Sequence, residues 1–534
     1  MGWSRHAGFS DRLCRPPRTS SCHGLTLPFL VALLPPTCKV NLSVKQYTEF
    51  HSEFIWTSLT TAILGGFAFG AYLAVVIGYG FPAGQGLYAL IQTHGHLQLI
   101  GWAGVFIMGI SLHFIPRLAS FPLPHSERIQ QILWLMVPGL LLRAVGGTVL
   151  ASLEDSPIFV PLSWLVGASG ALEGGAIVLY VSLLIGTMRG SSKVSRLPAL
   201  SAVKPFFGMM AAGWVLYACL NLLLVLHMAL TGAIAVDTAW NEFAVQAFVG
   251  LVLLPVAFAL SVRLFPLYLA LPAPDWPVHG TGSAYLLSVL LQLVPTAPPL
   301  AGLAPDVTKL AVALGTLLKG GIIVWFVWQL DLLTRRRPLG RQARFLDTGP
   351  DRPPTRPGFP DYGEFGRFER LVYAAYTWLV LAAFGELLGG AAIFLGYSIP
   401  IPTDAIRHMY LLGFVTHLIF GASVRMLPGF IRRKRVASTA LVDATFWLGS
   451  AAAVCRVVPL LSPSWLFDLL PAGDMLVQTI FAISGILGWG AVVCLATNLR
   501  QTANAPMKQV SDSNWTLSIA HSESGKRPER ESLS

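Results

Sequence analysis

Charged side chains are scarce in this sequence. Of the 534 residues, 12% are charged and 54% are hydrophobic, and the mean hydropathy is +0.62. Soluble proteins carry about 25% charged residues. The composition therefore excludes an ordinary water-soluble enzyme, because the apolar residues must gather in long runs, and runs of about 20 residues are typical of membrane-spanning helices. The 51 Gly and 37 Pro do not argue against this, since both are tolerated inside membrane helices.

Cysteine is also rare, and its spacing excludes several metal sites. The six cysteines form neither a C-x-x-C pair nor a C-x-x-C-H motif. Those patterns are typical of structural zinc sites and of covalently attached c-type haem. We expect neither group, and no disulfide framework.

Twelve apolar runs follow one another along the chain. We therefore predict an all-α membrane protein with about twelve transmembrane helices. The predicted spans are 55–80, 94–116, 129–151, 158–187, 205–235, 240–271, 280–302, 308–332, 369–399, 405–428, 440–461 and 475–498.

Three stretches lie outside these spans. Residues 1–52 form an N-terminal segment, residues 334–368 a basic, proline-rich linker, and residues 500–534 a tail that we expect to be disordered. The loops after even-numbered spans, together with the span ends beside them, hold 21 Lys and Arg, whereas those after odd-numbered spans hold only Lys309 and Arg407. By the positive-inside rule, both termini and the linker face the cytoplasm, in a membrane that we expect to be the bacterial inner membrane. The net charge of +11 is therefore topological, with membrane lipid and no nucleic acid as its partner.

An internal repeat divides the helices into groups. The second, sixth and tenth spans end in similar motifs, Ser-Leu-His-Phe-Ile-Pro at 111–116, Ser-Val-Arg-Leu-Phe-Pro at 261–266 and Ser-Val-Arg-Met-Leu-Pro at 423–428. Twenty residues before each proline stand His96, Gln246 and His408. The twelve helices thus form three pseudo-repeated units of four.

Four histidines are predicted to lie at one depth of the membrane. His94, His96 and His408 stand at the periplasmic ends of the second and tenth spans, and His227 stands at the same end of the fifth. Because neutral imidazoles on facing helices commonly hold haem iron, we predict that His96 and His408 together ligate one haem b. Imidazole also suits copper, and the alternative is a pair of histidines satisfied by hydrogen bonds. His94 points away from His96 and is a candidate ligand of a second metal.

Two further histidines stand outside this layer. His417 is about half a helical turn out of phase with His408, so it is either a ligand of a second centre or a buried structural residue. His113 lies about 25 Å from His96 along the helix, and we expect it to be a polar end at the cytoplasmic face.

Several charged side chains fall within the apolar spans. Arg143 and Arg456 occupy equivalent places in the third and eleventh spans, near the histidine layer. We predict that they bind the haem propionates, because a guanidinium binds carboxylate in bidentate fashion; pairing with buried acids or carbonyls is the alternative. Four more residues are candidate proton carriers or partners for one another: Glu173, Glu242, Lys319 and Glu386.

These residues together resemble the NnrS family, which comprises haem- and copper-containing membrane proteins linked to the nitric oxide response. The resemblance rests on His94-Gly-His96 with Gly101, and on His408 with Gly413 and Arg425. It implies a fold similar to haem-copper oxidase subunit I, haem and copper as cofactors, and nitric oxide or another small gas as a ligand. The electron donor is not specified.

Three functions are compatible with these residues. The first is a haem-binding, and by resemblance copper-binding, protein of nitrosative-stress defence. The second is a divergent catalytic subunit of a haem-copper oxidase or nitric oxide reductase. Against it, the sixth span holds no histidine and the seventh no His-His pair. The third is a twelve-helix transporter, which three units of four disfavour, because transporters of that size have two halves.

Overall fold

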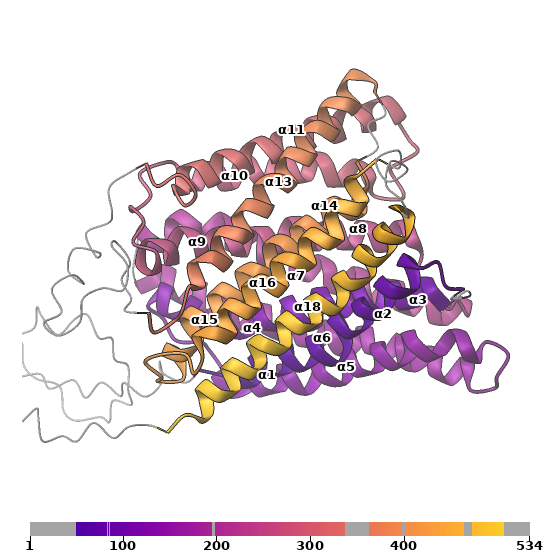
Figure 1. The fold of residues 1–534 in the computed structure, drawn as a ribbon, viewed down its shortest axis with the longest axis horizontal. Helices are drawn as coiled ribbons and strands as arrows, with labels where there is room; N and C mark the ends of the chain where they lie inside the picture. Colours follow the sequence, from indigo (N-terminus) through magenta and orange to yellow (C-terminus); the bar gives the residue numbers. More distant parts are fainter. Residues whose placement is uncertain are drawn as a thin grey trace, which may run out of the picture. The chain divides into compact units, whose positions relative to one another are not determined.

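The computed structural model describes residues 50–82, 84, 86–194, 198–336, 363–397, 401–463 and 473–506, with side chains left out for 191–194 and 198–200. Residues 1–49 and 507–534 and most of the predicted linker lie outside this part. All the regular secondary structure within it is helical (Figure 1).

Twelve helical segments appear in the predicted order, and several are built from consecutive helices. Spans 1 to 4 are α1, η2 and α2 (Ser52–Thr61, Ala62–Gly66, Phe67–Gly78); α3, η3 and α4 (Gly86–His96, Leu97–Gly104, Val105–Ala119); α5 (Ile129–Val149); and α6 (Phe159–Val194). Spans 5 to 8 are α7 (Pro198–Thr231); α8, η6 and α9 (Thr238–Phe248, Val249–Leu253, Leu254–Tyr268); α10 with η7 (Val278–Leu293, Val294–Thr296); and α11 (Pro305–Leu330). Spans 9 to 12 are α13 (Phe368–Leu395); α14, η8 and α15 (Thr403–His408, Met409–Thr416, His417–Phe430); α16 (Thr439–Leu461); and α18 (Gly473–Asn504).

Five boundaries differ from the predicted ones by six residues or more: the starts of spans 2 and 5 and the ends of spans 4, 7 and 12. Two of these differences have a cause that the sequence shows. Span 2 begins at Gly86 rather than at residue 94, because polar residues such as Gln92 and Thr93 hide its first turns from a hydropathy reading. Span 7 ends at Thr296 rather than at 302, because Pro298 and the proline after it cannot continue a helix.

Eleven of the described spans are long and apolar enough to cross a membrane. Span 7 is shorter, since α10 has 16 residues. With the 3₁₀ turn η7 it still reaches about 30 Å, which is about the thickness of the hydrocarbon core. It therefore supplies the twelfth predicted crossing.

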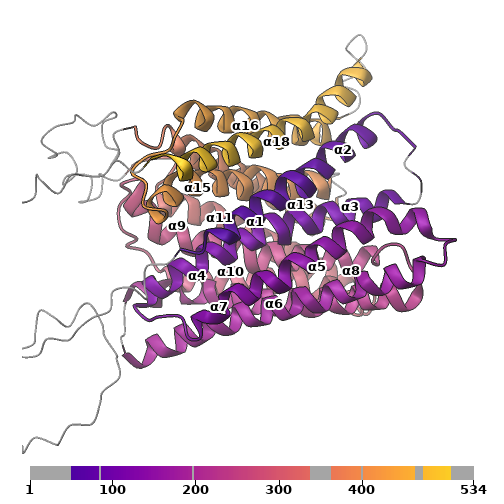
Figure 2. The same ribbon diagram turned by 90° about the horizontal axis from the view of Figure 1, so that it is seen from below.

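Spans 2, 6 and 10 form the centre of the bundle. In their most apolar stretches 94%, 72% and 72% of the residues are buried, against 33–50% in the other candidate spans. The remaining helices pack around them: α10 lies beside α11 and α16 beside α18 (Figure 1), and α6 beside α7 (Figure 2). The three spans with similar closing motifs are thus the three central ones, as a repeat of three units requires.

Close helix contacts repeat between the first and third units. A side chain at Gly101 of span 2 would meet Thr61 of span 1 at 2.3 Å, and one at Gly413 of span 10 would meet Trp378 of span 9 at 2.5 Å. Each glycine stands fifteen residues before its closing proline, and each lets the first helix of its unit approach the second.

The middle unit makes the same helix contact, but here the larger residue is on the second helix of the unit and the glycine is on the first. Leu251 of span 6 holds the equivalent position, and it packs against Gly213 of span 5. A small residue therefore stands on one side of this helix contact in every unit, which supports the division into three units of four.

The three central spans each contain a π-helical stretch. η3 begins directly after His96, η8 directly after His408, and η6 lies within span 6. A π-helix shifts the hydrogen-bond pattern of the helix, and such stretches are frequent at functional sites. The backbone conformation after His96 and after His408 is therefore of a kind that is frequent at functional sites, which is an observation separate from the side chains.

Both ends of the described chain lie at one end of the bundle. Phe50 packs against His113 and Phe430, at the closing ends of spans 2 and 10. Arg433, which follows span 10, donates a hydrogen bond to the carbonyl of Ala503 near the end of α18. An even number of crossings requires this arrangement.

A candidate haem site between the central helices

A cavity of about 410 Å³ lies between spans 1, 2, 3, 5, 6, 10, 11 and 12. Ligand pockets in proteins usually measure about 300–1,000 Å³. Five of the seven predicted site residues line it: His94, His96, His408, Arg143 and Arg456. The structure thus brings together the candidates that the repeat pointed to.

His94 is held by a hydrogen bond that fixes the direction of its ring. Its Nδ1 lies 2.8 Å from the carbonyl oxygen of Gly66, the last residue of the π-helix η2. Because a carbonyl only accepts, Nδ1 carries the proton and Nε2 keeps its lone pair. Gly70 makes room for the ring, since a side chain there would meet His94 Cε1 at 2.7 Å.

His408 of span 10 has the same arrangement. Its Nδ1 lies 2.8 Å from the carbonyl oxygen of Asp404, one turn earlier in its own helix. The Asp404 carboxylate lies 3.5 Å from the same nitrogen. Metal-ligating histidines typically donate their other ring N–H to a carbonyl or carboxylate in this way. His94 and His408 are also close enough to interact electrostatically.

His96 differs, because both of its ring nitrogens have side-chain partners. Nε2 lies 3.0 Å from the Glu173 carboxylate, and Nδ1 lies 3.0 Å from the hydroxyl of Tyr217. Glu173 is fully buried and also accepts a hydrogen bond from Asn221 at 2.9 Å. In the neutral ring, Nε2 donates to Glu173 and Nδ1 accepts from Tyr217, so no lone pair of His96 faces the cavity.

The hydrogen bonds favour a different ligand pair from the predicted one. His96 and His408 were predicted to hold one haem, with His94 turned towards a second metal. The hydrogen bonds instead leave His94 and His408 with matching free Nε2 atoms and place His96 in a satisfied polar network. Repeat equivalence pointed to this helix, and the hydrogen bonds distinguish its two histidines.

The two arginines line the same cavity and are both buried, 7% and 8% exposed. Arg143 interacts electrostatically with Glu173, but its Nη1 has no hydrogen-bond partner among the described residues. Arg456 lies with its guanidinium carbon 4.2 Å from the centre of the Phe481 ring and interacts with Asp404. An acid near each arginine, the buried Glu173 and the half-exposed Asp404, partly offsets the positive charge for which we predicted haem propionates as partners. The unpartnered nitrogen of Arg143 still leaves room for an anion.

Two predicted metal residues lie away from the cavity. His227 is exposed on α7. His417 is fully buried elsewhere, with Nδ1 3.0 Å from the carbonyl of Leu412 and Nε2 3.4 Å from Ser450 Oγ. Nowhere in the described part of the chain do three His, Cys, Asp or Glu side chains gather around a point where a metal ion could sit. Copper binding by these residues stays a prediction.

The other charged candidates, the buried Lys319 and Glu386 and the exposed Glu242, form ion pairs, one of the two roles considered for them. Lys319 Nζ lies 2.6 Å from Glu386 and 2.7 Å from the amide oxygen of Gln292. Glu242 lies 3.8 Å from Arg407 at the rim of the histidine cavity. The Lys319 pair is apart from that cavity and is a separate polar cluster.

Sequence reasoning missed three residues of the site. Tyr217 gave no signal, because its contact with His96 joins two distant spans. Asp404 stands one turn before His408, and this spacing could have indicated the carbonyl that orients the ring. Arg407 was counted only for topology, although it lines the cavity.

With this geometry established, comparison with known proteins gives a structural relative. A solved structure described as a cryo-EM structure of a haem-copper terminal oxidase dimer superimposes with a TM-score of 0.58, at 14% sequence identity, and the match covers 85% of this chain and 83% of that one. The chain shares its fold with that oxidase. No family model and no curated protein sequence matches the chain.

The likeness settles the architecture and leaves the activity open. The coverage of most of both chains confirms the predicted fold class, an all-α membrane protein of the haem-copper oxidase kind. At 14% identity it carries neither metal ligands nor a reaction from one chain to the other. The family resemblance to NnrS rests on sequence motifs alone.

Proposed function

We propose that this membrane protein binds a b-type haem in the histidine cavity, and that the Nε2 atoms of His94 and His408 would hold its iron. The observation that carries the proposal is the matched pair of Nδ1–H to carbonyl hydrogen bonds at these residues, which leaves two Nε2 lone pairs in one cavity. A protein needs only two such nitrogens to hold haem iron from both sides. The fold, shared with a haem-copper oxidase, is compatible with this cofactor.

The charged groups around the cavity fit the anionic edge of a haem. Arg143, Arg407 and Arg456 line the cavity from three different helices, and Arg143 Nη1 has no partner within the described chain. An isolated buried cation is costly, so an incoming carboxylate would be stabilised there. Asp404 and Glu173 offset part of this positive charge.

A haem held by two histidines supplies reversible one-electron transfer. The residues of this chain do the rest. Gly66 and Asp404 orient the two imidazoles through their carbonyls, and the arginines favour the anionic groups. We further propose a role in the nitric oxide response or in nitrosative-stress defence, based on the resemblance to NnrS proteins. Copper is a second proposed cofactor, for which the described residues provide no cluster of ligands.

The alternative is a divergent catalytic subunit of a haem-copper oxidase or nitric oxide reductase. The shared fold favours it, whereas span 6 holds no histidine and span 7 no His-His pair, which argues against a second metal beside the haem. The second alternative, a twelve-helix transporter, fits three units of four less well.

Spectroscopy and turnover on one preparation separate these functions. Protein purified from haem-replete bacterial membranes should show a low-spin haem b spectrum and no sustained consumption of oxygen or nitric oxide with an artificial electron donor. Sustained turnover would favour the catalytic alternative. A protein that is folded and inserted but holds no haem would overturn the proposal and favour the transporter.

A further inference from the structure

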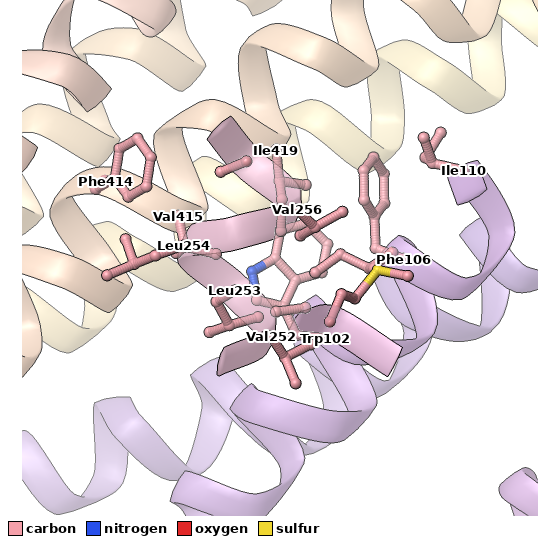
Figure 3. Packing of buried hydrophobic residues seen from close by; sticks show 14 of the residues in the cluster. Trp102, Phe106, Ile110, Val252, Leu253, Leu254, Val256, Phe414, Val415 and Ile419 are labelled. Atoms are coloured by element: carbon pink, nitrogen blue, oxygen red, sulfur yellow. The ribbon is translucent and has the colours of Figure 1, made fainter. Parts of the chain in front are cut away.

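A second, smaller cavity lies next to the histidine cavity. It measures about 90 Å³ and is lined by the three central spans, with residues such as Ile110, Leu253, Ala257 and Ile419. Figure 3 shows how side chains of these spans meet, with Phe106 and Ile110 from α4, Val256 from α9, and Val415 and Ile419 from span 10. Val415 lines both cavities, so its side chain is part of the wall between them.

The walls of this second cavity offer almost nothing to a water molecule. Ser111 donates its hydroxyl to the carbonyl of Ile107 and is bonded to Tyr180. Ser261 likewise donates to Ala257 and is bonded to Tyr376. Buried water needs two to four polar partners, and apolar cavities without them stay dry.

The cytoplasmic end of the cavity is closed to anions as well. Arg425 lines it there, but its guanidinium carbon lies 4.6 Å from the centre of the Tyr268 ring and 4.2 Å from that of Phe365. The charge is thus balanced against aromatic faces. An apolar guest is the kind of molecule that the remaining surface can accommodate.

We propose that this cavity binds one small, uncharged, apolar molecule of the size of a diatomic gas or a xenon atom, and holds it beside the histidine cavity behind Val415. The volume supports this size class, because an apolar cavity of about 150 Å³ engineered in another protein binds xenon or benzene. Drug-sized ligands such as quinones need about 300 Å³ or more. The inference concerns the cavity alone and does not rest on haem binding.

Xenon is the probe, because its electrons mark its position. In crystals of the full chain pressurised with xenon, we expect one anomalous peak between Ile110, Ala257 and Ile419. Ala257→Leu fills the cavity and should abolish the peak. Ala212→Leu adds the same atoms at an exposed position of α7 and should leave the peak unchanged. Leu260→Ala enlarges the cavity and should raise xenon occupancy, so the test does not depend on one variant folding.

Several results would overturn the proposal. The first is the absence of xenon from the wild-type cavity. The second is an anomalous peak whose height is the same in the wild type, in Ala257→Leu and in Leu260→Ala. Ordered water in the cavity would show that its walls do provide the polar partners that a buried water molecule needs. A continuous rod of density entering from the membrane face would show that a lipid or detergent chain occupies it instead of a gas.

Discussion

The buried ion pair between Lys319 and Glu386 allows a quantitative test of the packing between α11 and α13. The two charges lie 2.6 Å apart, and their side chains are 9% and 6% exposed. Lys319→Met leaves the carboxylate buried without its cation and also removes the hydrogen bond to Gln292. Breaking a buried pair in this way costs about 3–5 kcal/mol, because the remaining charge keeps its desolvation penalty.

The double variant Lys319→Met, Glu386→Leu should recover most of that loss. Replacing both charges by apolar side chains of similar volume is often neutral, since neither desolvation penalty remains. The matched control is Lys309→Met, the same substitution at an exposed position of the same helix, which should change stability by no more than about 0.5 kcal/mol.

The assay is the free energy of unfolding in detergent micelles for the wild type and the three variants. The expected order has the single Lys319 variant well below the other three. A double variant as unstable as the single one would refute the reasoning, because the loss would then come from packing or from Gln292 rather than from a stranded charge.

Three further predictions concern the site and the topology. Gly70→Leu should place a side chain where the His94 ring lies and should lower haem content at least tenfold in purified protein, whereas Gly174→Ala, with nothing within 4 Å, should keep it. Arg456→Gln should lower the haem midpoint potential in a redox titration by about 70 mV, the effect of a unit charge about 10 Å away at an effective dielectric constant of about 20; an unchanged potential would remove this arginine from the haem environment. Reporter fusions within 334–368 and in the C-terminal tail should report the cytoplasm, and a periplasmic signal would contradict the charge-based topology.

Hydrophobic runs and the repeat were enough to predict the fold. All twelve spans appear where long apolar stretches stand, because in a membrane each helix must satisfy its own backbone and each apolar run is therefore a self-contained signal. The closing motifs at Pro116, Pro266 and Pro428 identified the three central helices. The errors concerned boundaries: polarity hid the start of span 2, proline ended span 7 early, and spans 4, 5 and 12 run six or seven residues beyond the predicted ends.

The sequence predicted which helices contribute to the site, but it did not predict the hydrogen-bond partners of the individual side chains. Equivalent positions brought His408, Arg143 and Arg456 to one cavity. Which histidine of span 2 keeps an unpaired Nε2 depends on the carbonyl of Gly66 and the carboxylate of Glu173, which lie in other spans. Such partners are set by how the helices pack. The spacing of residues in a single sequence does not reveal that packing.

The central claim is tested most directly by the haem spectra of three single variants, prepared and reconstituted in the same way. His94→Ala and His408→Ala should each abolish the low-spin haem spectrum while the protein remains inserted in the membrane. His96→Ala should keep that spectrum, because its ring nitrogens are bound to Tyr217 and Glu173 rather than presented to the cavity. Loss of the low-spin signal in His96→Ala together with its retention in His94→Ala would contradict the account and restore the pair that the sequence alone suggested.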